Sequence, residues 1–316
     1  MKKFFIFTTI LFSSLLSFSQ VGIGTTNPNA SAVLDIVSTN KGLLPPRVGN
    51  VIAVTAPVAG LMVYDISQQC MRYYNGTIWS ACMGGIVPPT FTCGDVITDI
   101  DGNSYSTVDI NGQCWMTSDL KVSRYPNGDA IPYIDSDAAW VTLGANDTDD
   151  AYAFYGDSNS NGTVDIAHPD YGALYSYAAA IGDNWARDNN PNQGVCPDGW
   201  HLPSHAEWTT LTTSLGGIGV AGGKMKETGN SHWNSPNTGA TNSTGFTGLP
   251  GGYRIGYTSS SGNFISIQDY SAWWSSTATS SSKAYTRGLN YNNDDVYNST
   301  FPNYKSYGIC VRCIKD

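Results

Sequence analysis

The N-terminal segment of the chain decides in which compartment the rest of it folds, and so which cross-links it can form. Two lysines follow the first methionine, a short apolar run covers residues 4–16, and Ser17 and Ser19 form a small-x-small cleavage site. These are the three parts of a secretory signal, and the apolar run is shorter than the roughly 20 residues that span a bilayer. We therefore expect residues 1–19 to be a signal peptide and the mature chain to leave through the Sec pathway, to be secreted or held at the cell surface.

Seven cysteines in an exported chain predict disulfide bonds, because disulfides persist in oxidising compartments. Cys70 and Cys82 flank one expected hairpin and are expected to bridge across it. Cys93 and Cys114 flank a second expected hairpin, centred on Asp101-Gly102, and are the natural second pair. The odd number of cysteines leaves at least one thiol unpaired or shared with another chain, and the sequence alone does not determine the complete pairing.

The charge balance argues against several classes of partner. The chain has 16 Lys and Arg against 25 Asp and Glu, a formal net charge of −9, and such a chain repels the phosphate backbone of nucleic acids. It has no basic amphipathic stretch for anionic lipids and no second apolar run of membrane-spanning length. Aromatic residues are nearly as frequent as charged ones, at 12% against 13%, unlike a disordered chain. We expect a folded protein with no nucleic-acid partner and no transmembrane segment.

Composition divides the mature chain into two parts. Residues 20–87 contain short strand-like runs and an Asn75-Gly76 pair expected to form a type I′ hairpin turn, which together predict a small β-rich head. Two prolines mark an expected linker at residues 88–90. Residues 91–316 are rich in Gly, Asn, Ser, Thr and aromatic residues and are expected to form one larger domain.

Few helices are expected in the larger domain, and all of them are short. Ser204 stands three residues before Glu207, which is a capping box, and apolar residues follow it at helical spacing. Two further helices are expected within residues 171–181 and 220–227. The remainder reads as short antiparallel strands and long ordered loops, so the fold class is α+β.

Three segments of the larger domain occur together in a specific order. They are QCWMTSDLK at 113–121, CPDGWHLPSHAEW at 196–208, and WWSST at 273–277 with VRCIKD at 311–316. In this order they closely resemble the Fibrobacter succinogenes major paralogous domain family, over about residues 91–316. The resemblance implies a C-type-lectin-like domain and an extracellular setting, and it implies no established reaction.

Two shorter similarities accompany this one. The GWHLPSHAEW segment is similar to a segment of formylglycine-generating-enzyme-like domains, which share the same fold. The VGIGTTNPNASAVLDI segment at 21–36 resembles a head found on many exported bacterial proteins and on fibre-like phage proteins. The second similarity says little about activity, and oligomerisation through the head is part of a structural alternative.

An acidic run suggests a bound cation. Between Arg124 and Arg187 there is no Lys or Arg but there are ten Asp residues, which repel one another unless a cation or solvation relieves them. Within the run, oxygen-bearing side chains alternate around Gly162 with the spacing of a calcium loop. The expected ligands are Asp157, Asn159, Asn161, Thr163 and Asp165. His168 occupies the place of the usual bidentate Glu, and the alternative is a solvated loop whose side chains bond their own backbone.

A second group of residues suggests a sugar site. Aromatic rings beside amide groups suit saccharides, because the ring covers the apolar face of a pyranose while the amides reach its hydroxyls. The expected ligand-binding residues are Trp233, Asn234, Asn237, Tyr253 and Tyr257. The loop that contains the first three, together with Glu227 and Asn230, faintly resembles the calcium site of sugar-binding C-type lectins, but a loop that only caps its own turns is favoured over a second calcium site. Other aromatic residues expected in polar loops are Trp140, Trp185 and Tyr291.

The C-terminal cysteines admit two interpretations. If residues 309–314 form one strand, Cys313 shares a face with Ile309 and Val311, and Cys310 lies on the opposite face. A buried Cys313 is then the better partner for Cys196, and Cys310 is the unpaired thiol. The rival interpretation takes Cys310 and Cys313 as a reactive pair like that of formylglycine-generating enzymes, but residues on opposite faces cannot easily act together.

No other arrangement of residues indicates catalysis. His201 is expected to pack in the core beside Trp200, and it shares no helical face with His205 because Pro203 separates them. No HExxH, GxSxG or phosphate-binding loop occurs. We therefore expect a protein that is not an enzyme but an extracellular binding or adhesion module, with a glycan or surface protein as partner and calcium as a cofactor. The alternatives are a formylglycine-generating-like oxidoreductase and a structural fibre or coat protein that oligomerises through its head.

Overall fold

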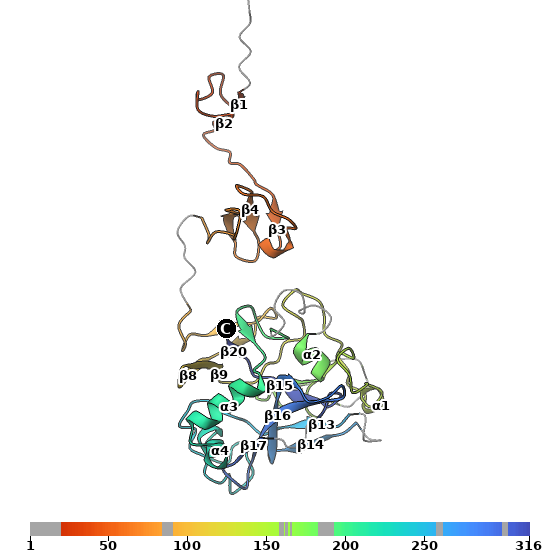
Figure 1. Cartoon of the computed structure of the whole chain (residues 1–316). Coiled ribbons are helices and arrows are strands. Elements are labelled where there is room, and N and C mark those ends of the chain that lie inside the picture. The colour runs from red at the N-terminus through yellow and green to blue at the C-terminus, as the bar shows by residue number, and fades with distance from the viewer. Residues whose placement is uncertain are drawn as a thin grey trace, which may run out of the picture. The chain divides into compact units, whose positions relative to one another are not determined.

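The computed structural model shows two compact units, residues 1–90 and 91–316, which are described separately (Figure 1). The signal segment 1–19 and the linker 88–90 lie outside the described residues. Within the described residues no helix is both long enough and apolar enough to cross a bilayer. The structure describes residues 20–83, 91–157, 161, 164, 166–182, 193–256, 262–298 and 303–316.

The N-terminal unit is built from two very small sheets. Strand β1 (Val21–Ile23) pairs in parallel with β2 (Leu34–Ile36). A second sheet has the order β3-β4-β5, in which β3 is parallel and β5 antiparallel to β4. Its strands are Arg47–Val48, Met62–Asp65 and Cys70–Tyr73, and the 3₁₀ turn η1 (Val51–Ala53) lies between the first two. In both parallel pairs the strands are joined by a connection longer than a hairpin turn, as parallel pairing requires.

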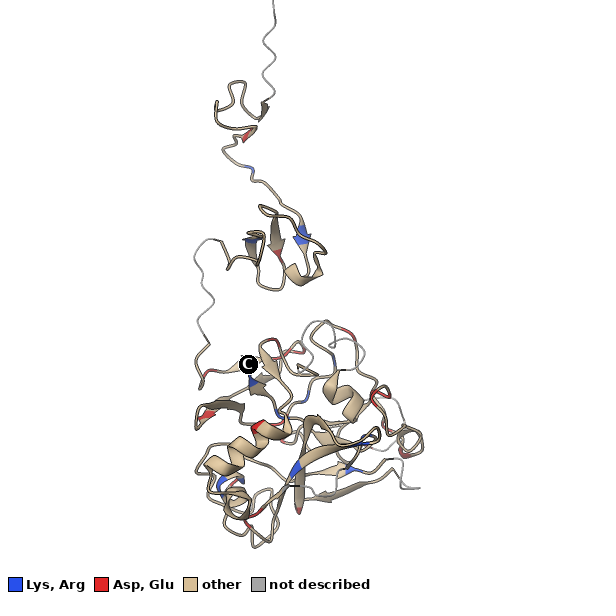
Figure 2. Ribbon diagram, viewed as in Figure 1, with Lys and Arg blue, Asp and Glu red and all other residues tan. Residues whose placement is uncertain are grey.

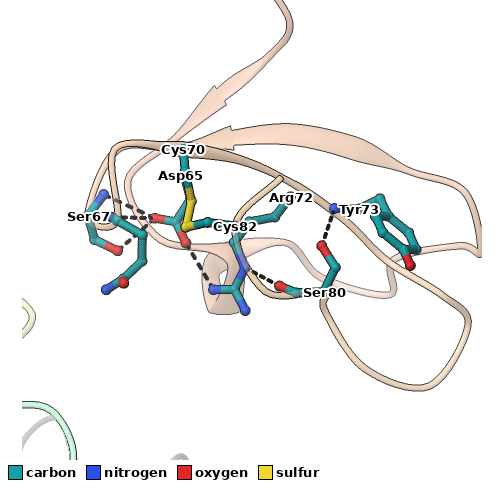
Figure 3. Close-up of a disulfide and its surroundings, with 8 residues drawn as sticks. Asp65, Ser67, Cys70, Arg72, Tyr73, Ser80 and Cys82 are labelled. Carbon is teal, nitrogen blue, oxygen red and sulfur yellow. Dashed lines mark hydrogen bonds and ion pairs between the residues drawn. A yellow bond between two sulfur atoms is a disulfide. The ribbon is translucent and has the colours of Figure 1, made fainter. Parts of the chain in front are cut away.

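One disulfide and one buried carboxylate hold the second of these sheets together (Figure 3). Cys70 is bonded to Cys82, as expected. Asp65 is fully buried and accepts hydrogen bonds from Ser67 and from Arg72, whose Nη1 lies 3.3 Å away. Burial opposes ionisation of Asp65, but these hydrogen bonds outweigh it and lower its pKa.

The Asn75-Gly76 turn differs from the expectation. It is a four-residue loop, because Tyr74 and Trp79 form the bridge that closes it. Asn75 Oδ1 accepts hydrogen bonds from the backbone of Thr77 and Ile78, and only Gly76 has a positive φ, of 101°. A type I′ turn requires positive φ at both central residues, so the side-chain hydrogen bonds of Asn75 selected a different turn.

In the part of the C-terminal unit that the structure describes, short β-strands outnumber the four short helices. In the described residues its main sheet has nine strands: β10-β11-β19-β15-β13-β14 in order, with β16 beside β15 and both β17 and β18 beside β16. The bounds are β10 Tyr152–Ala153, β11 Leu174–Tyr175, β13 Gly251–Arg254, β14 Phe264–Ile267, β15 Tyr270–Ala278, β16 Lys283–Asn290, β17 Val296–Asn298, β18 Asn303–Tyr304 and β19 Ile309–Cys310.

The remaining strands form two smaller sheets. One has the order β12-β20-β9-β8, and its strands are Trp200–His201, Ile314–Lys315, Gln113–Met116 and Thr107–Ile110. The other is the hairpin of β6 (Ile97–Thr98) and β7 (Ser104–Tyr105) around Gly102, as predicted. The expectation of antiparallel strands holds only in part, because β15 is parallel to both β13 and β19.

The helices follow their capping signals more closely than their apolar stripes. Helix α3 (His205–Ser214) begins at the predicted capping box, and α4 (Ile218–Met225) overlaps the helix expected at 220–227. The helix expected over 171–181 is wrong in its first half, which is strand β11, because its backbone pairs with β10 and β19. Only α2 (Tyr177–Ile181) is helical, between the Ser176 cap and Gly182. Helix α1 (Asp137–Trp140) was not predicted.

Large aromatic side chains form the core on both faces of the main sheet. The adjacent residues Trp273 and Trp274 of β15 point to opposite faces, one toward the cluster of α3 and α4 and the other toward α2. The segments that carry the family resemblance supply five core tryptophans, each at most 3% exposed: Trp115, Trp200, Trp208, Trp273 and Trp274.

The chain changes sheets between Cys310 and Ile314, which the expected single strand did not anticipate. Strand β19 lies in the main sheet and β20 in the smaller one, and all six residues from 309 to 314 are buried. The expected Cys196–Cys313 and Cys93–Cys114 disulfides are present, and Cys310 is the free, buried cysteine. The predicted Cys196–Cys313 pairing is confirmed, but the assumption that residues 309–314 form one strand with Cys310 and Cys313 on opposite faces was wrong. Residues that cross between two sheets are enclosed on every side.

An ion pair occupies this crossing point. The Arg312 guanidinium donates from Nε to Asp119 Oδ1 at 2.8 Å, and Trp273 Nε1 donates to the same oxygen at 2.7 Å. The guanidinium also lies 4.1 Å from the ring centroid of Phe246. Arg312 is 0% and Asp119 6% exposed, so both charges are removed from water and depend on one another.

We predict that Arg312→Met costs about 3–5 kcal/mol in the free energy of unfolding, because it leaves a buried carboxylate without its cation. The matched control is Arg124→Met, which breaks the half-exposed pair with Asp101 and should cost about 0–1 kcal/mol. Denaturant unfolding followed by tryptophan fluorescence measures both variants. Equal losses of stability in the two variants would contradict a dominant stabilising role for the buried pair of Arg312 and Asp119.

Candidate ligand-binding site

A pocket of about 380 Å³ opens on the face of the main sheet opposite α3 and α4. Its floor is apolar and its walls carry phenol, hydroxyl, amide and carboxylate groups. The lining residues come from β13, β14, β15, β16 and β19 and from the turns beside them: Tyr253, Ser266, Asp269, Tyr270, Ala272, Asn290, Tyr291 and Ile309. Of the residues expected to bind a ligand, Tyr253 lines this pocket.

The alternation of β15 produces one wall of the pocket. Tyr270 pairs with Asn290 and Ala272 with Gly288, so these residues face the same side of the sheet. A Cβ at Gly288 would lie 2.0 Å from the Tyr270 hydroxyl oxygen. Glycine at this position therefore lets the Tyr270 ring lie across β16.

The phenols of Tyr253 and Tyr270 in the pocket remain neutral. Burial raises the pKa of Tyr270, and the neighbouring Tyr253 adds to the effect. Burial also raises the pKa of Tyr253, with a further contribution from Tyr307. A neutral phenol both donates and accepts a hydrogen bond, so each of these groups can pair with a hydroxyl of a ligand.

Two residues beside the pocket have left-handed backbone. Ser266 and Gln268 have φ values of 64° and 66° and form a tight turn, in which the amide of Asp269 donates to the Ser266 carbonyl at 3.2 Å. Asn234 binds this turn twice. Its amide donates to Gln268 O, and its Nδ2 donates to Asp269 Oδ1, both at 2.9 Å. Asn234, expected to bind a ligand, thus holds the acidic group of the pocket in place.

Lys226 is buried behind the Asn290 side of the pocket. It is 0% exposed, and its Nζ donates to the carbonyls of Thr238, Asn290 and Asn293 at 2.8, 2.9 and 2.7 Å. Burial lowers the pKa of Lys226 to about 8, with Asp294 opposing the shift. Three carbonyls satisfy the three donors of an ammonium group, so this cation ties together two loops, one of which reaches the pocket.

Trp233 and Asn237 also support the loop and are not open to a ligand. Trp233 is 1% exposed, with Nε1 bonded to Gly248 O at 2.9 Å and Lys226 Nζ 5.5 Å from its ring centroid. Asn237 Nδ2 donates to the carbonyls of Glu227 and Gly229. The ring face expected to meet a sugar is therefore part of the core, and the loop caps its own turns, as the favoured interpretation held. Tyr257 lies outside the described residues.

The acidic run finds its cations elsewhere in the chain. Arg254 donates to Asp137 at 2.8 Å, and Lys305 pairs with Asp147; both basic side chains are buried. These cations lie more than 100 residues further along the sequence, which is why the run alone suggested a missing charge. Figure 2 shows the few charged residues dispersed over the ribbon.

The calcium loop is described only at two of its expected ligands. Asp157 is 2% exposed and accepts a hydrogen bond from the Tyr133 hydroxyl, whereas Asn161 is exposed. Asn159, Thr163 and Asp165 lie outside the described residues. Among the described residues, no three His, Cys, Asp or Glu side chains are grouped as a metal site would require. Calcium at this loop stays a prediction.

His201 differs from its expected role as a core residue. Its two ring nitrogens lie 2.8 Å from Glu207 Oε1 and 2.7 Å from Asp316 Oδ1. The hydrogen bond to Glu207 raises the pKa of His201 against the effect of burial, and Asp316 adds to it. Burial opposes ionisation of Glu207, but the hydrogen bonds from His201 and Ser204 outweigh it and lower the pKa to about 2. The cluster joins the start of α3 to the end of the chain.

Sequence reasoning missed most of the pocket. Asp269, Tyr270, Asn290 and Ser266 belong to strands and turns that carry no motif. The available signal was the period-two alternation from Tyr270 to Trp274, which places a tyrosine, an alanine and a tryptophan on one face. That signal does not reveal which neighbouring strands complete the wall.

The C-terminal unit is thus a mostly β domain whose main sheet carries a tyrosine-lined pocket on one face. The chain belongs to the Fibrobacter succinogenes major domain family, whose family model matches residues 108–315. A second family model, described as a phage tail like trimerisation region, matches residues 22–100. No curated protein and no solved structure matched the chain.

We predict that Lys226→Met destabilises the C-terminal unit and loosens the pocket wall, because each carbonyl left buried without a donor costs about 1–3 kcal/mol. Lys224→Met, in the last turn of α4, is the matched control. Among the described residues Lys224 Nζ donates to Leu215 O alone, at 2.7 Å, and its loss should cost about 0.5–1.5 kcal/mol. Denaturant unfolding gives both values, and amide hydrogen exchange of residues 238 and 290–293 should rise in Lys226→Met alone. Unchanged exchange there would refute the role of Lys226.

Proposed function

We propose that this is an exported, non-catalytic binding or adhesion module that recognises an extracellular glycan, free or on a surface protein, in the tyrosine pocket. The observation that carries the proposal is the lining itself. Three tyrosines surround an apolar floor, while Asp269, Asn290 and Ser266 supply hydrogen-bonding groups. A pyranose needs such a combination, since it has an apolar C–H face and a rim of hydroxyls.

The size and charge of the pocket favour a small neutral unit. A volume of about 380 Å³ is near the lower end of ligand pockets, roughly 300–1,000 Å³. The one charged lining residue is Asp269, and the chain as a whole has a net charge of −9. Both repel acidic sugars and accept uncharged ones.

The oxidoreductase alternative has less support. It requires Cys310 and Cys313 to act as a pair, but Cys313 is bonded to Cys196 and Cys310 is fully buried. Burial also raises the pKa of the Cys310 thiol, which Asp119 reinforces, whereas reactive cysteines have lowered values. We therefore favour binding over cysteine chemistry.

Two finer elements belong to the same proposal. The first is a C-type-lectin-like fold for the C-terminal unit, with which a curled sheet and few helices are compatible. The second is calcium bound by oxygen ligands of the loop 157–165. Each is tested apart from the glycan, by an experimental structure and by calorimetry with calcium.

Tyr253→Ala should weaken glycan binding by about 5- to 30-fold in Kd, because a ring that stacks on a sugar contributes about 1–2 kcal/mol. A glycan array probed with the mature chain, with calcium and with EDTA, identifies the ligand, and calorimetry measures Kd. Tyr285→Ala is the matched control, since Tyr285 packs on His205 at the opposite face of the sheet, 4.0 Å between ring centroids. No array signal, or equal Kd for Tyr253→Ala and wild type, would defeat the proposal.

A second proposal concerns the head, which we infer to be a trimerisation unit. Fifteen of the 22 exposed large apolar side chains in the described residues belong to residues 20–83, and only Val51 and Val63 of its apolar side chains are buried. A unit with so small a core is marginal as a single chain. The match to a trimerisation region over 22–100 supports two further copies of this chain as the partner.

The β1–β2 pair offers the clearest contact surface. Val21 pairs with Leu34 and Ile23 with Ile36, and all four side chains are 39–54% exposed. A two-stranded sheet is barely stable in water by itself. Covering these side chains with neighbouring copies would stabilise each by about 1.5–3 kcal/mol when buried completely.

We therefore expect the mature chain to sediment as a trimer and Ile23→Asp to sediment as a monomer, because three carboxylates would meet in the apolar contact. Ile218→Asp is the matched control, since Ile218 is 50% exposed on α4 in the other unit, and it should remain trimeric. Analytical ultracentrifugation distinguishes the species. A monomeric wild type, or a trimeric Ile23→Asp, would contradict this assignment.

A further inference from the structure

Five tyrosine rings follow one another across the C-terminal unit and through the pocket. The ring centroids are separated by 6.0 Å from Tyr304 to Tyr307, by 6.1 Å from Tyr307 to Tyr253, by 6.0 Å from Tyr253 to Tyr270, and by 6.2 Å from Tyr270 to Tyr297. We call these five residues the tyrosine row. Two of its members, Tyr253 and Tyr270, line the pocket.

The row is open to solvent along its length. Tyr297 is 41% exposed, and the other four side chains are partly exposed. The rings come from β13, β15, β17 and β18 and from the turn before β19, so five separate segments converge on it. A protein core would bury such rings completely, as it buries the adjacent Trp273 and Trp274. A continuous line of partly exposed rings suits a ligand that is itself long and has apolar faces.

Few charges accompany the row, and those that do are engaged. Lys283 Nζ lies 4.7 Å from the Tyr304 ring centroid, and Asp269 accepts a hydrogen bond from Asn234. Hydrogen-bonding groups lie beside the middle of the row, at Ser266 and Asn290. Such a surface can satisfy hydroxyl or amide groups of a ligand but offers no cationic patch to an acidic polymer.

We propose that the ligand is a linear, uncharged oligosaccharide chain whose middle residue enters the pocket and whose neighbours lie over the rings on both sides. The proposal rests on the glycan-binding function inferred above and adds that internal residues of a chain, not a single terminal sugar, are recognised. A chain of β-1,4-linked hexoses is the suitable shape, because its hydroxyls are largely equatorial and leave C–H faces for the nearly parallel rings of Tyr253 and Tyr307, whose planes differ by 14°. The rings of Tyr270 and Tyr297 are tilted by 76° and 66° to the preceding ring of the row and would meet the chain with their edges.

The test is the dependence of affinity on chain length. Calorimetry with the full mature chain uses β-1,4-linked oligomers of glucose, mannose or N-acetylglucosamine, from one to six residues, with oligogalacturonic acids of equal length as acidic controls. At least one neutral series should bind with Kd falling by about tenfold or more between one and five residues, while the acidic series should not bind.

Variants locate the contacts. The double substitution Tyr304→Ala and Tyr307→Ala, and separately Tyr297→Ala, should abolish most of the gain from chain length and leave binding of the shortest oligomers unchanged. Tyr285→Ala, from the opposite face of the sheet, should change neither. Unchanged melting temperatures exclude loss of folding as the cause.

The outcomes separate this inference from the proposed function. Two results would refute recognition of a sugar chain along the tyrosine row but leave the glycan-binding pocket in place. One is a single sugar that binds as tightly as a hexamer, and the other is array ligands that bind in the pocket while every neutral series fails. If neither the array nor any series gives binding that depends on Tyr253, both are refuted.

Discussion

The pair of Arg312 and Asp119 is the interaction on which the C-terminal unit depends. It lies where the chain leaves the main sheet after β19 and enters the smaller sheet at β20, so it holds the two sheets together. Trp273 shares the same carboxylate oxygen from the centre of β15. Both charges are out of water, and each is tolerable only while the other is present. The floor of the pocket includes Ile309, three residues before Arg312, so the position of the pocket follows from this crossing.

Buried cations also organise the loops. Arg254 and Lys305 pair with the acidic run, and Lys226 donates to three backbone carbonyls. Arg254 and Lys226 each donate to several backbone carbonyls of segments that have little regular secondary structure of their own. Ordered loops of this kind need such partners, because buried backbone groups cannot remain unpaired. Of the 13 Lys and Arg residues that the structure describes, five are buried: Lys226, Arg254, Arg287, Lys305 and Arg312.

The two proposals for function reinforce each other. A trimer formed by the head would carry three tyrosine rows on one particle. Each row would hold a neutral sugar chain through ring stacking and a few hydrogen bonds, which gives modest affinity at a single site. Simultaneous engagement of a polymer by several sites raises the overall affinity by about 10²–10⁴ without new contacts, provided that the spacing permits it. Adhesion to an extended polysaccharide uses this arrangement well.

The sequence by itself determined the features that depend on neighbouring residues. Short spacings predicted the capping box at Ser204 and Glu207, the Asp101-Gly102 hairpin, and the disulfides Cys70–Cys82 and Cys93–Cys114. The order of three sequence segments along the chain indicated the family. Only the tertiary structure decided what depends on distant partners. These features are the cations that pair with the acidic run, the burial of Trp233, the two carboxylates that bind His201, and the pocket. Its walls come from five strands and their turns, and no local pattern states which strands will be neighbours, because that choice is made by packing across the whole sheet.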